Sequence, residues 1–239
     1  MIPKIIHYAW LGDSQKKPID MIESWGRILP GWEIKEWNET NLDLDRYSFS
    51  RIAYDLGSYG PALDLLRVDI LIEQGGVWLD TDVVVHESLE PFLNYSFFIG
   101  HCDKSSFNIG TIGAEAGHPL LFRVQNWYLE HQVTLEGVSK EWLTDLIFYK
   151  FNTSLALLGA LKVLYGFIPT GRPQTLDADI RIESAPVFTI RGNYGVKNYA
   201  EHLYEGSWRN KFDWAGMSRA AYETDTISDT GPKMTRKKL

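Results

Sequence analysis

The pattern of apolar and polar residues over positions 60–85 predicts a helix followed by a strand, and the other predicted elements are arranged around this stretch. Pro61 suits the first turn of a helix, and apolar residues then recur at helical spacing, at Leu63, Leu66, Ile70 and Leu71. The pair Gly75-Gly76 is expected to end the helix, because glycine adopts the left-handed cap conformation at little cost. Two apolar triplets, 77–79 and 83–85, then predict a strand-like segment.

Asp80 and Asp82 interrupt this segment between its two apolar triplets. A carboxylate inside a buried strand is costly unless a partner compensates its charge. A divalent cation is one such partner, and ligand oxygens favour a hard ion such as Mg²⁺ or Mn²⁺. The alternative is a solvated turn between two short strands, because an Asp-x-Asp triplet is common by chance. The helix aimed at the triplet favours the metal site over the turn.

The same helix carries Asp64 and Arg67, which are three residues apart and therefore neighbours on one face. One interpretation is a surface ion pair that contributes little to stability. The other is that this helix face points into the site that holds Asp80.

Similar patterns predict the elements on both sides of this stretch. The predicted strands are Lys4–Trp10, Trp32–Trp37, Val83–Val85 and Phe97–Gly100, and short strands are expected again after Tyr165. The predicted helices are Ile19–Leu29, Tyr47–Leu56 and Gly117–Glu130, with a helix-rich segment over Trp142–Leu164. Alternating strands and helices with a mixed later half indicate a single α/β domain, and 239 residues suit one domain.

Composition and charge narrow the class of protein. The chain is 44% hydrophobic with a formal net charge of −7, which argues against nucleic acid as a partner. Cys102 is the only cysteine, so a reducing compartment is expected, and no apolar run is long enough to predict a membrane span. These features predict a cytoplasmic protein. The segment 225–239 is expected to be a loose tail whose basic end is either solvated or rests on anionic lipid at the inner face of the cell membrane.

The order Asp64-x-x-Arg67, Gly75-Gly76, Trp78 and Asp80-x-Asp82 resembles the core of glycosyltransferase family 32. That family includes outer-chain mannosyltransferases of yeast and transferases of bacterial capsular polysaccharides. The pattern is also similar to the catalytic domain of the large clostridial glucosylating toxins. The resemblance implies the GT-A fold, with a Rossmann-like nucleotide-binding half, over residues 1–224.

The resemblance also implies roles for particular residues. Trp10 would stack on the nucleobase, although a place in the hydrophobic core is the alternative from the sequence alone. Asn41 and Asn108 would lie near the nucleotide and the sugar, or serve only as turn residues. His202 would complete the metal site, with Glu205 as its substitute. The remaining residues expected to bind the nucleotide sugar are Trp78, Ser207 and Trp208.

The function expected from this reasoning is transfer of a hexose, with retention of configuration, from a nucleoside diphosphate sugar to a glycan or lipid-linked oligosaccharide in capsular or exopolysaccharide synthesis. A UDP-sugar is the favoured donor, and Mn²⁺ or Mg²⁺ is the expected cofactor. Asp82 would be the principal metal ligand, and Asp80 would reach both ribose and metal. Asp64 and Arg67 would hold the sugar, with Arg67 also offsetting phosphate charge.

Two alternatives come from other functional classes. A sugar nucleotidyltransferase would also place carboxylates on a metal, but it should show a glycine-rich basic loop after the first strand, and residues 13–17 are only weakly basic. A lectin-like module would use Asp80 and Asp82 for Ca²⁺ and bind free glycan without a nucleotide. Turnover of a nucleotide sugar separates the proposed enzyme from the lectin.

Overall fold

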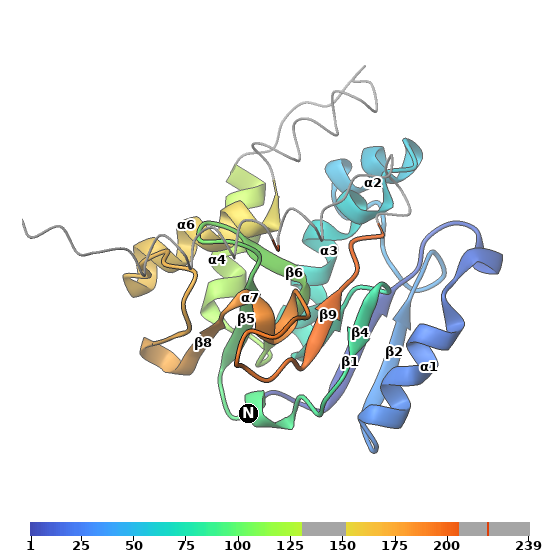
Figure 1. Cartoon of the computed structure of the whole chain (residues 1–239). Coiled ribbons are helices and arrows are strands. Elements are labelled where there is room, and N and C mark those ends of the chain that lie inside the picture. Colours follow the sequence, from blue (N-terminus) through green and yellow to red (C-terminus); the bar gives the residue numbers. More distant parts are fainter. Residues whose placement is uncertain (131–151, 206–218, 220–239) are drawn as a thin grey trace, which may run out of the picture.

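A computed structural model describes residues 1–130, 152–205 and 219 and shows a central sheet with helices packed on it (Figure 1). The strands are β1 (Ile5–Ala9), β2 (Glu33–Trp37), β3 (Gly76–Leu79), β4 (Val83–Val85), β5 (Phe97–His101), β6 (Phe107–Ala114), β7 (Gln174–Leu176), β8 (Ile180–Glu183) and β9 (Ala200–His202). The α-helices are α1 (Ile19–Ile28), α2 (Ser48–Asp55), α3 (Tyr59–Gln74), α4 (Pro119–Glu130), α6 (Thr153–Tyr165) and α7 (Ala185–Phe188). Short 3₁₀ turns are η1 (Ser14–Lys16), η2 (Glu90–Phe92) and η3 (Asp177–Asp179).

The main sheet has the strand order β2-β1-β3-β6-β5-β8-β7 in the described part of the chain. Strands β2, β1 and β3 are parallel, as are β5 and β8, whereas β6 and β7 run antiparallel to their neighbours. A separate two-stranded sheet pairs β4 with β9. The parallel first half with a mixed second half confirms the predicted α/β architecture.

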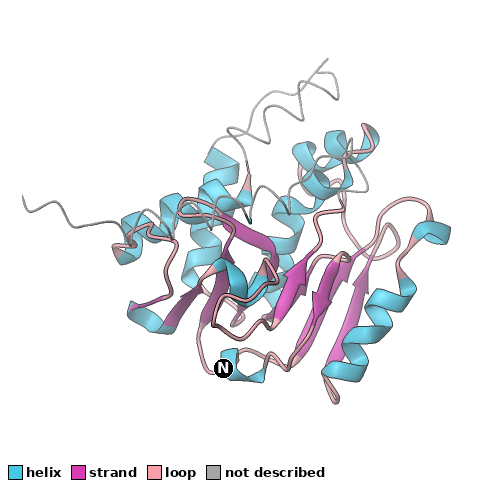
Figure 2. Cartoon of the chain, in the orientation of Figure 1, coloured by secondary structure: helices cyan, strands magenta, loops and turns pink. Residues whose placement is uncertain are grey.

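Side chains alternate between two hydrophobic cores, one on each face of the main sheet. Ile6 and Val77 point to the face covered by α1, α7 and the β4-β9 pair, where Trp25 of α1 donates a hydrogen bond to the carbonyl of Val83. Trp78 points to the opposite face, which is covered by α2, α3, α4 and α6. Figure 2 shows helices on both sides of the magenta strands. The sheet is therefore the middle layer of three.

The double glycine ends α3 as predicted, although Gly75, with φ 63° and ψ −162°, does not adopt the left-handed helical cap conformation. Gly75 and Gly76 have φ angles of 63° and 99°, in the region where residues with a Cβ are strained. A Cβ on Gly76 would also lie 2.7 Å from the carbonyl oxygen of Ile5 in the neighbouring strand. Glycine is needed here both to reverse the chain and to let α3 feed directly into β3.

The strand-like segment predicted through Asp80, Thr81 and Asp82 is wrong, because β3 and β4 belong to different sheets. The chain leaves the main sheet in a turn closed by a bond from the Val83 amide to the Asp80 carbonyl, 3.0 Å long. The turn alternative from the sequence analysis is therefore the correct local geometry. Its carboxylates are not freely solvated, however, since their side chains are 26% and 18% exposed.

The other predicted elements agree with the structure to within a few residues, as expected for boundaries inferred from pattern. The helix-rich segment predicted from Trp142 coincides with α6 from residue 153 onward, and its earlier part lies outside the described residues. Ser207, Trp208 and the tail 225–239 also lie outside them. Over the described ranges, the structure holds no helix long and apolar enough to cross a membrane.

Candidate active site

Asp80, Asp82 and His202 come together at the edge of the sheet where the parallel strand β3 ends. One ligand atom from each side chain lies within 4.8 Å of the other two. His202 Nε2 is 3.1 Å from Asp82 Oδ1 and 3.9 Å from Asp80 Oδ2. Two carboxylates and an imidazole at these separations form a set of donors that fits a divalent cation.

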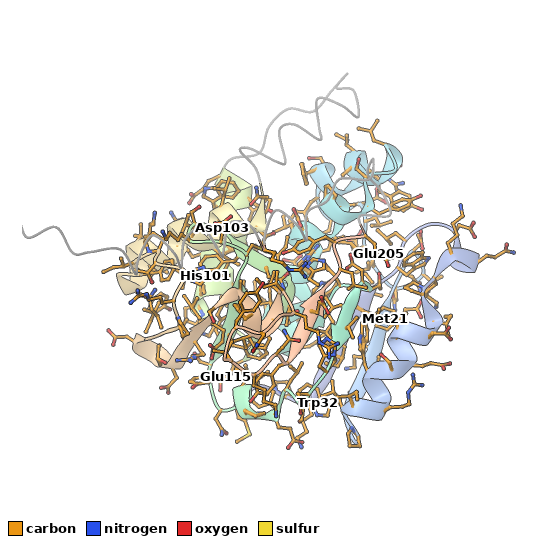
Figure 3. The ribbon with its side chains drawn as sticks, viewed as in Figure 1. Met21, Trp32, His101, Asp103, Glu115 and Glu205 are labelled. Atoms are coloured by element: carbon orange, nitrogen blue, oxygen red, sulfur yellow. The ribbon has the colours of Figure 1, made fainter. Side chains whose placement is uncertain are left out.

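The pairing of β4 with β9 places His202 beside the turn. Val83 is the register partner of His202, so the histidine meets the residue that directly follows Asp82. The backbone amides of Leu203 and Glu205 then donate to Asp82, at 3.0 Å to its carbonyl and 2.9 Å to its Oδ2. In Figure 3, Glu205 lies at the end of the described segment that follows β9, on the side of α2. Among the described residues, His202 and not Glu205 completes the cluster.

Asp80 is held through one of its two carboxylate oxygens. Trp78 Nε1 donates to Asp80 Oδ1 at 2.7 Å, and Arg67 Nη1 donates to the same oxygen at 3.2 Å. The other oxygen, Oδ2, faces His202. Trp78 is only 1% exposed, and its indole orients Asp80; contact of Trp78 with the nucleotide stays a prediction.

Asp64 and Arg67 form a buried ion pair rather than a surface pair, with 3.3 Å between Asp64 Oδ1 and Arg67 Nη2. Arg67 is 3% exposed, lies over the Trp78 ring at 5.2 Å, and also donates to the carbonyl of Ile109 at 3.1 Å. The predicted helix face does point at Asp80. Both side chains are buried in this structure, and contact of either with the sugar or the phosphates stays a prediction.

A bulge in β6 brings the backbone against this cluster. On β5, Ile99 and Gly100 are consecutive, but their partners on β6 are Ile112 and Asn108, so residues 109–111 are extra. The bulge presents the carbonyl of Gly110 to the Asp80 amide at 2.9 Å. A Cβ on Gly110 would lie 2.7 Å from His202 Cε1, so a larger residue would displace the ring.

Asn108 is 1% exposed, and its amide is bonded within the protein. Asn108 lies in β6 and not in a turn, and its Oδ1 is 2.8 Å from His202 Nδ1. Contact of Asn108 with the sugar stays a prediction. Tyr204 stacks on the His202 ring, with 4.0 Å between ring centroids. The sequence analysis did not identify Gly110 or Tyr204, although a glycine inside a strand often marks close approach of another group.

Opposite charge shifts the pKa values inside the cluster. Burial alone would lower the pKa of His202, but Asp82, through its charge and its hydrogen bond, and the charge of Asp80 raise it above the ordinary value. Burial alone would likewise raise the pKa of Asp82, but the charge and hydrogen bond of His202 hold it below the ordinary value. The opposite charges of His202 and Asp82 thus stabilise the ionised form of each other.

Two further predicted residues lie at the neighbouring loops. Trp10 follows β1 directly, and its half-buried indole donates to the carbonyl of Asp13 at 3.0 Å, so it is not a core tryptophan. Asn41 is exposed and donates to the carbonyl of Glu36 at 2.8 Å, which closes the loop after β2. Contact of either residue with a nucleotide stays a prediction.

Residues 15–98 match the family model described as the glycosyltransferase sugar-binding region containing DXD motif. The matched span includes α3, Arg67 and the Asp80-Thr81-Asp82 turn. Residues 15–98 therefore carry a glycosyltransferase sugar-binding region. The predicted resemblance to glycosyltransferase family 32 is confirmed, and His202 lies beyond the matched span.

The curated proteins similar to this chain include two from yeasts. Inositol phosphoceramide mannosyltransferase 3 of Schizosaccharomyces pombe is 29% identical over 128 residues, which are 52% of this chain and 36% of that protein. Mannosyl phosphorylinositol ceramide synthase CSH1 of Saccharomyces cerevisiae is 24% identical over 185 residues, which are 69% of this chain and 47% of that protein. The chain thus spans less than half the length of either relative.

Among solved structures, the PaToxG glycosyltransferase is similar in fold. It matches with a TM-score of 0.50 at 14% identity, over 68% of this chain and 69% of that one. The likeness agrees with the GT-A fold predicted from the sequence and with the α/β layers described above.

Proposed function

We propose that this domain transfers a hexose from a nucleoside diphosphate sugar to a hydroxyl group of a glycan or a glycolipid, with retention of configuration. The observation that carries the proposal is the convergence of Asp80, Asp82 and His202 at the end of β3. The first two lie in the matched sugar-binding region, and the third arrives from the far end of the described chain.

A divalent cation bound there would neutralise the charge that develops on the diphosphate as the sugar departs. The ligands would be Asp80, Asp82 and His202. Magnesium prefers oxygen ligands, whereas an imidazole nitrogen suits a softer ion, so we propose Mn²⁺ first and Mg²⁺ second.

The residues around the cation would orient the donor. Asp80 keeps one carboxylate oxygen on Trp78 and Arg67, which leaves the other for the cation or the ribose. Trp10 follows β1, the parallel neighbour of β3, so Trp10 and Asp80 leave the same edge of the sheet. Ligands in open α/β sheets bind at this edge, and we propose that Trp10 stacks on the nucleobase there.

UDP-hexoses are the first donors to test, since the sequence analysis favoured them. The two yeast relatives are named for mannose transfer and for a ceramide lipid, so GDP-mannose and lipid-linked acceptors are included beside free glycans. A role in capsular or exopolysaccharide synthesis belongs to the same proposal.

The deciding experiment measures release of nucleoside diphosphate from a panel of UDP- and GDP-hexoses with Mn²⁺, with and without acceptors. The parent should turn over its preferred donor, slowly with water alone and faster with an acceptor. Chelation should abolish turnover, and added Mn²⁺ should restore it. Asp82→Asn should lower turnover on the order of a hundredfold or more, the scale of lost electrostatic stabilisation.

The matched control is Asp20→Asn, the same change at an exposed carboxylate on α1, which should leave turnover unchanged. Full turnover by the chelated parent would refute the metal role. If no donor is turned over while free glycans bind in the presence of Ca²⁺, the lectin alternative replaces the proposal.

A further inference from the structure

His202 has two ring nitrogens, and the metal role proposed for it above depends on which of them carries the proton. Neutral imidazole has one N–H and one lone pair, and only the lone pair binds a cation. Nε2 is the nitrogen that faces Asp80 and Asp82. A neutral ring with its proton on Nε2 would place hydrogen where the cation must bind.

The orientation of the Asn108 amide is fixed by two backbone groups that have only one possible role each. The Gly110 N–H can only donate, and it lies 3.1 Å from one atom of the amide, which must therefore be Oδ1. The Phe188 carbonyl can only accept, and it lies 3.0 Å from the other, which must be Nδ2. In a flipped amide, Nδ2 would face the Gly110 N–H and Oδ1 would face the Phe188 carbonyl, so neither bond could form.

The contact from Asn108 Oδ1 to His202 Nδ1 is 2.8 Å and is buried. Because Oδ1 only accepts, Nδ1 must carry the hydrogen of this bond. We propose that Asn108 is a positioning residue that holds His202 in the Nδ1–H tautomer, so that the Nε2 lone pair is directed at a divalent cation between Asp80 and Asp82.

Two neighbours restrict the ring so that this bond can select the tautomer. Tyr204 stacks on the imidazole, and Gly110 lies so close to Cε1 and Nδ1 that only a residue without Cβ leaves the ring in place. Rotation of the ring to present Nδ1 to the cation would break the bond to Asn108. Partners of metal-binding histidines typically change metal affinity 10–100-fold when they are removed.

The experiment compares two Asn108 variants by their affinity for Mn²⁺ alone, measured from free Mn²⁺ by electron paramagnetic resonance. Asn108→Leu removes the acceptor, and affinity should fall about 10–100-fold. Asn108→Asp keeps the acceptor but loses the donor to Phe188, and it should bind Mn²⁺ at least as tightly as the parent. Asn198→Leu is the control, because Asn198 Nδ2 also donates to the carbonyls of α7 and β9 and does not touch His202.

The second measurement reports the tautomer directly, by ¹⁵N–¹H spectra of the His202 imidazole in the Mg²⁺-loaded protein, assigned with His202→Gln. The proton should be on Nδ1 in the parent and in Asn108→Asp. If Asn108→Leu does not fold, the spectra of the parent and of Asn108→Asp still show which nitrogen of His202 carries the proton.

Unchanged Mn²⁺ affinity in folded Asn108→Leu overturns the proposal. So does a loss of Mn²⁺ affinity in Asn108→Asp or in Asn198→Leu that equals the loss in Asn108→Leu. An Nδ1 without a proton in the Mg²⁺-loaded parent overturns it as well. A parent that binds neither ion overturns the metal role in the proposed function as well. If the parent binds Mn²⁺ and the Asn108 variants bind it with the same affinity, this inference alone is overturned.

Discussion

At the scale of single residues, the contacts of Arg67 give it a structural role beside the one expected from the sequence. Its guanidinium is shared among Asp64, Asp80 and the carbonyl of Ile109, and its Nε has no hydrogen-bond partner among the described residues. A buried guanidinium in these contacts supports Asp80. Any effect of Arg67 on transfer should therefore pass through the position of that carboxylate.

Arg67→Met should lower turnover on the order of a hundredfold and should also weaken Mn²⁺ binding, because Asp80 loses a donor. It should reduce the free energy of unfolding by about 3–5 kcal/mol, since Asp64 stays buried without its cation. Denaturant titration and steady-state kinetics measure the two effects. If turnover falls while Mn²⁺ affinity is unchanged, Arg67 acts on the donor directly.

Arg46→Met is the matched control, because Arg46 lies before α2 and pairs with a carboxylate of the same helix α3. Arg46 pairs with the buried Asp69 of α3, 3.1 Å from Nε to Oδ2, away from the metal cluster. This variant should also destabilise the fold, but turnover measured well below its unfolding temperature should equal that of the parent.

At the scale of elements, the β6 bulge joins the two halves of the site. The carbonyl of Ile109 accepts a hydrogen bond from Arg67, and the carbonyl of Gly110 accepts one from the backbone N–H of Asp80. Gly110 also lies beside the His202 ring. Regular pairing with β5 would remove the extra residues 109–111 that make these contacts. The bulge is therefore part of the site, not an irregularity at its margin.

Gly110→Ala should weaken Mn²⁺ affinity about tenfold or more, because the new Cβ pushes the His202 ring away from Asp82. Isothermal titration with Mn²⁺ measures the change. Gly159→Ala is the control: it makes the same substitution in α6, where a Cβ meets nothing within 4 Å. It should leave the affinity unchanged and raise the free energy of unfolding by roughly 0.5–1 kcal/mol. Equal Mn²⁺ affinity in parent and Gly110→Ala would contradict this role of the bulge.

At the scale of the whole molecule, buried histidines link stability to pH, and burial lowers the pKa of three of them, His7, His101 and His118. Burial lowers the pKa of His7 and of His118 to about 4. His7 is held neutral between two fixed partners, since Trp37 Nε1 donates to its Nδ1 and its Nε2 donates to the carbonyl of Gly75. The unfolded chain binds protons at His7 and His118 from about pH 6.5 downward, whereas the folded protein does so only near pH 4.

The free energy of unfolding should therefore fall as pH drops from 6.5 toward 4, by up to about 1.4 kcal/mol per pH unit for each histidine. His202 has a raised pKa, so its contribution is complete below pH 6.5 and is lost only at higher pH. The lowered pKa of Asp82 matters only below its ordinary value of 3.8. Urea titrations at pH 6.5 and 5.0 measure the slope. A free energy of unfolding that does not fall over this interval would contradict the lowered pKa values of the buried histidines.

The local sequence pattern was sufficient to predict most helices and strands and both ends of α3. Apolar spacing and the Gly75-Gly76 pair are read over a few residues, where backbone geometry decides the outcome. The same pattern could not show that the chain leaves the sheet at Asp80, because apolar triplets look alike whether they lie in one sheet or in two. The chemical type of the candidate metal ligands could also be predicted from the sequence, since carboxylates and imidazoles have the same donor atoms in any fold.

Tertiary structure alone decided which of these residues meet and which are buried. Asn108 and His202 are 94 positions apart, and Glu205 and Asp82 are 123 apart, so no local spacing could indicate either contact. Trp78 and Arg67 look like ligand-binding residues in the sequence, yet both are buried beside Asp80 and act as its donors. Burial and partner depend on how β4, β6 and β9 pack around one turn, because a side chain's charge and hydrogen bonds are set by whatever the fold brings within reach.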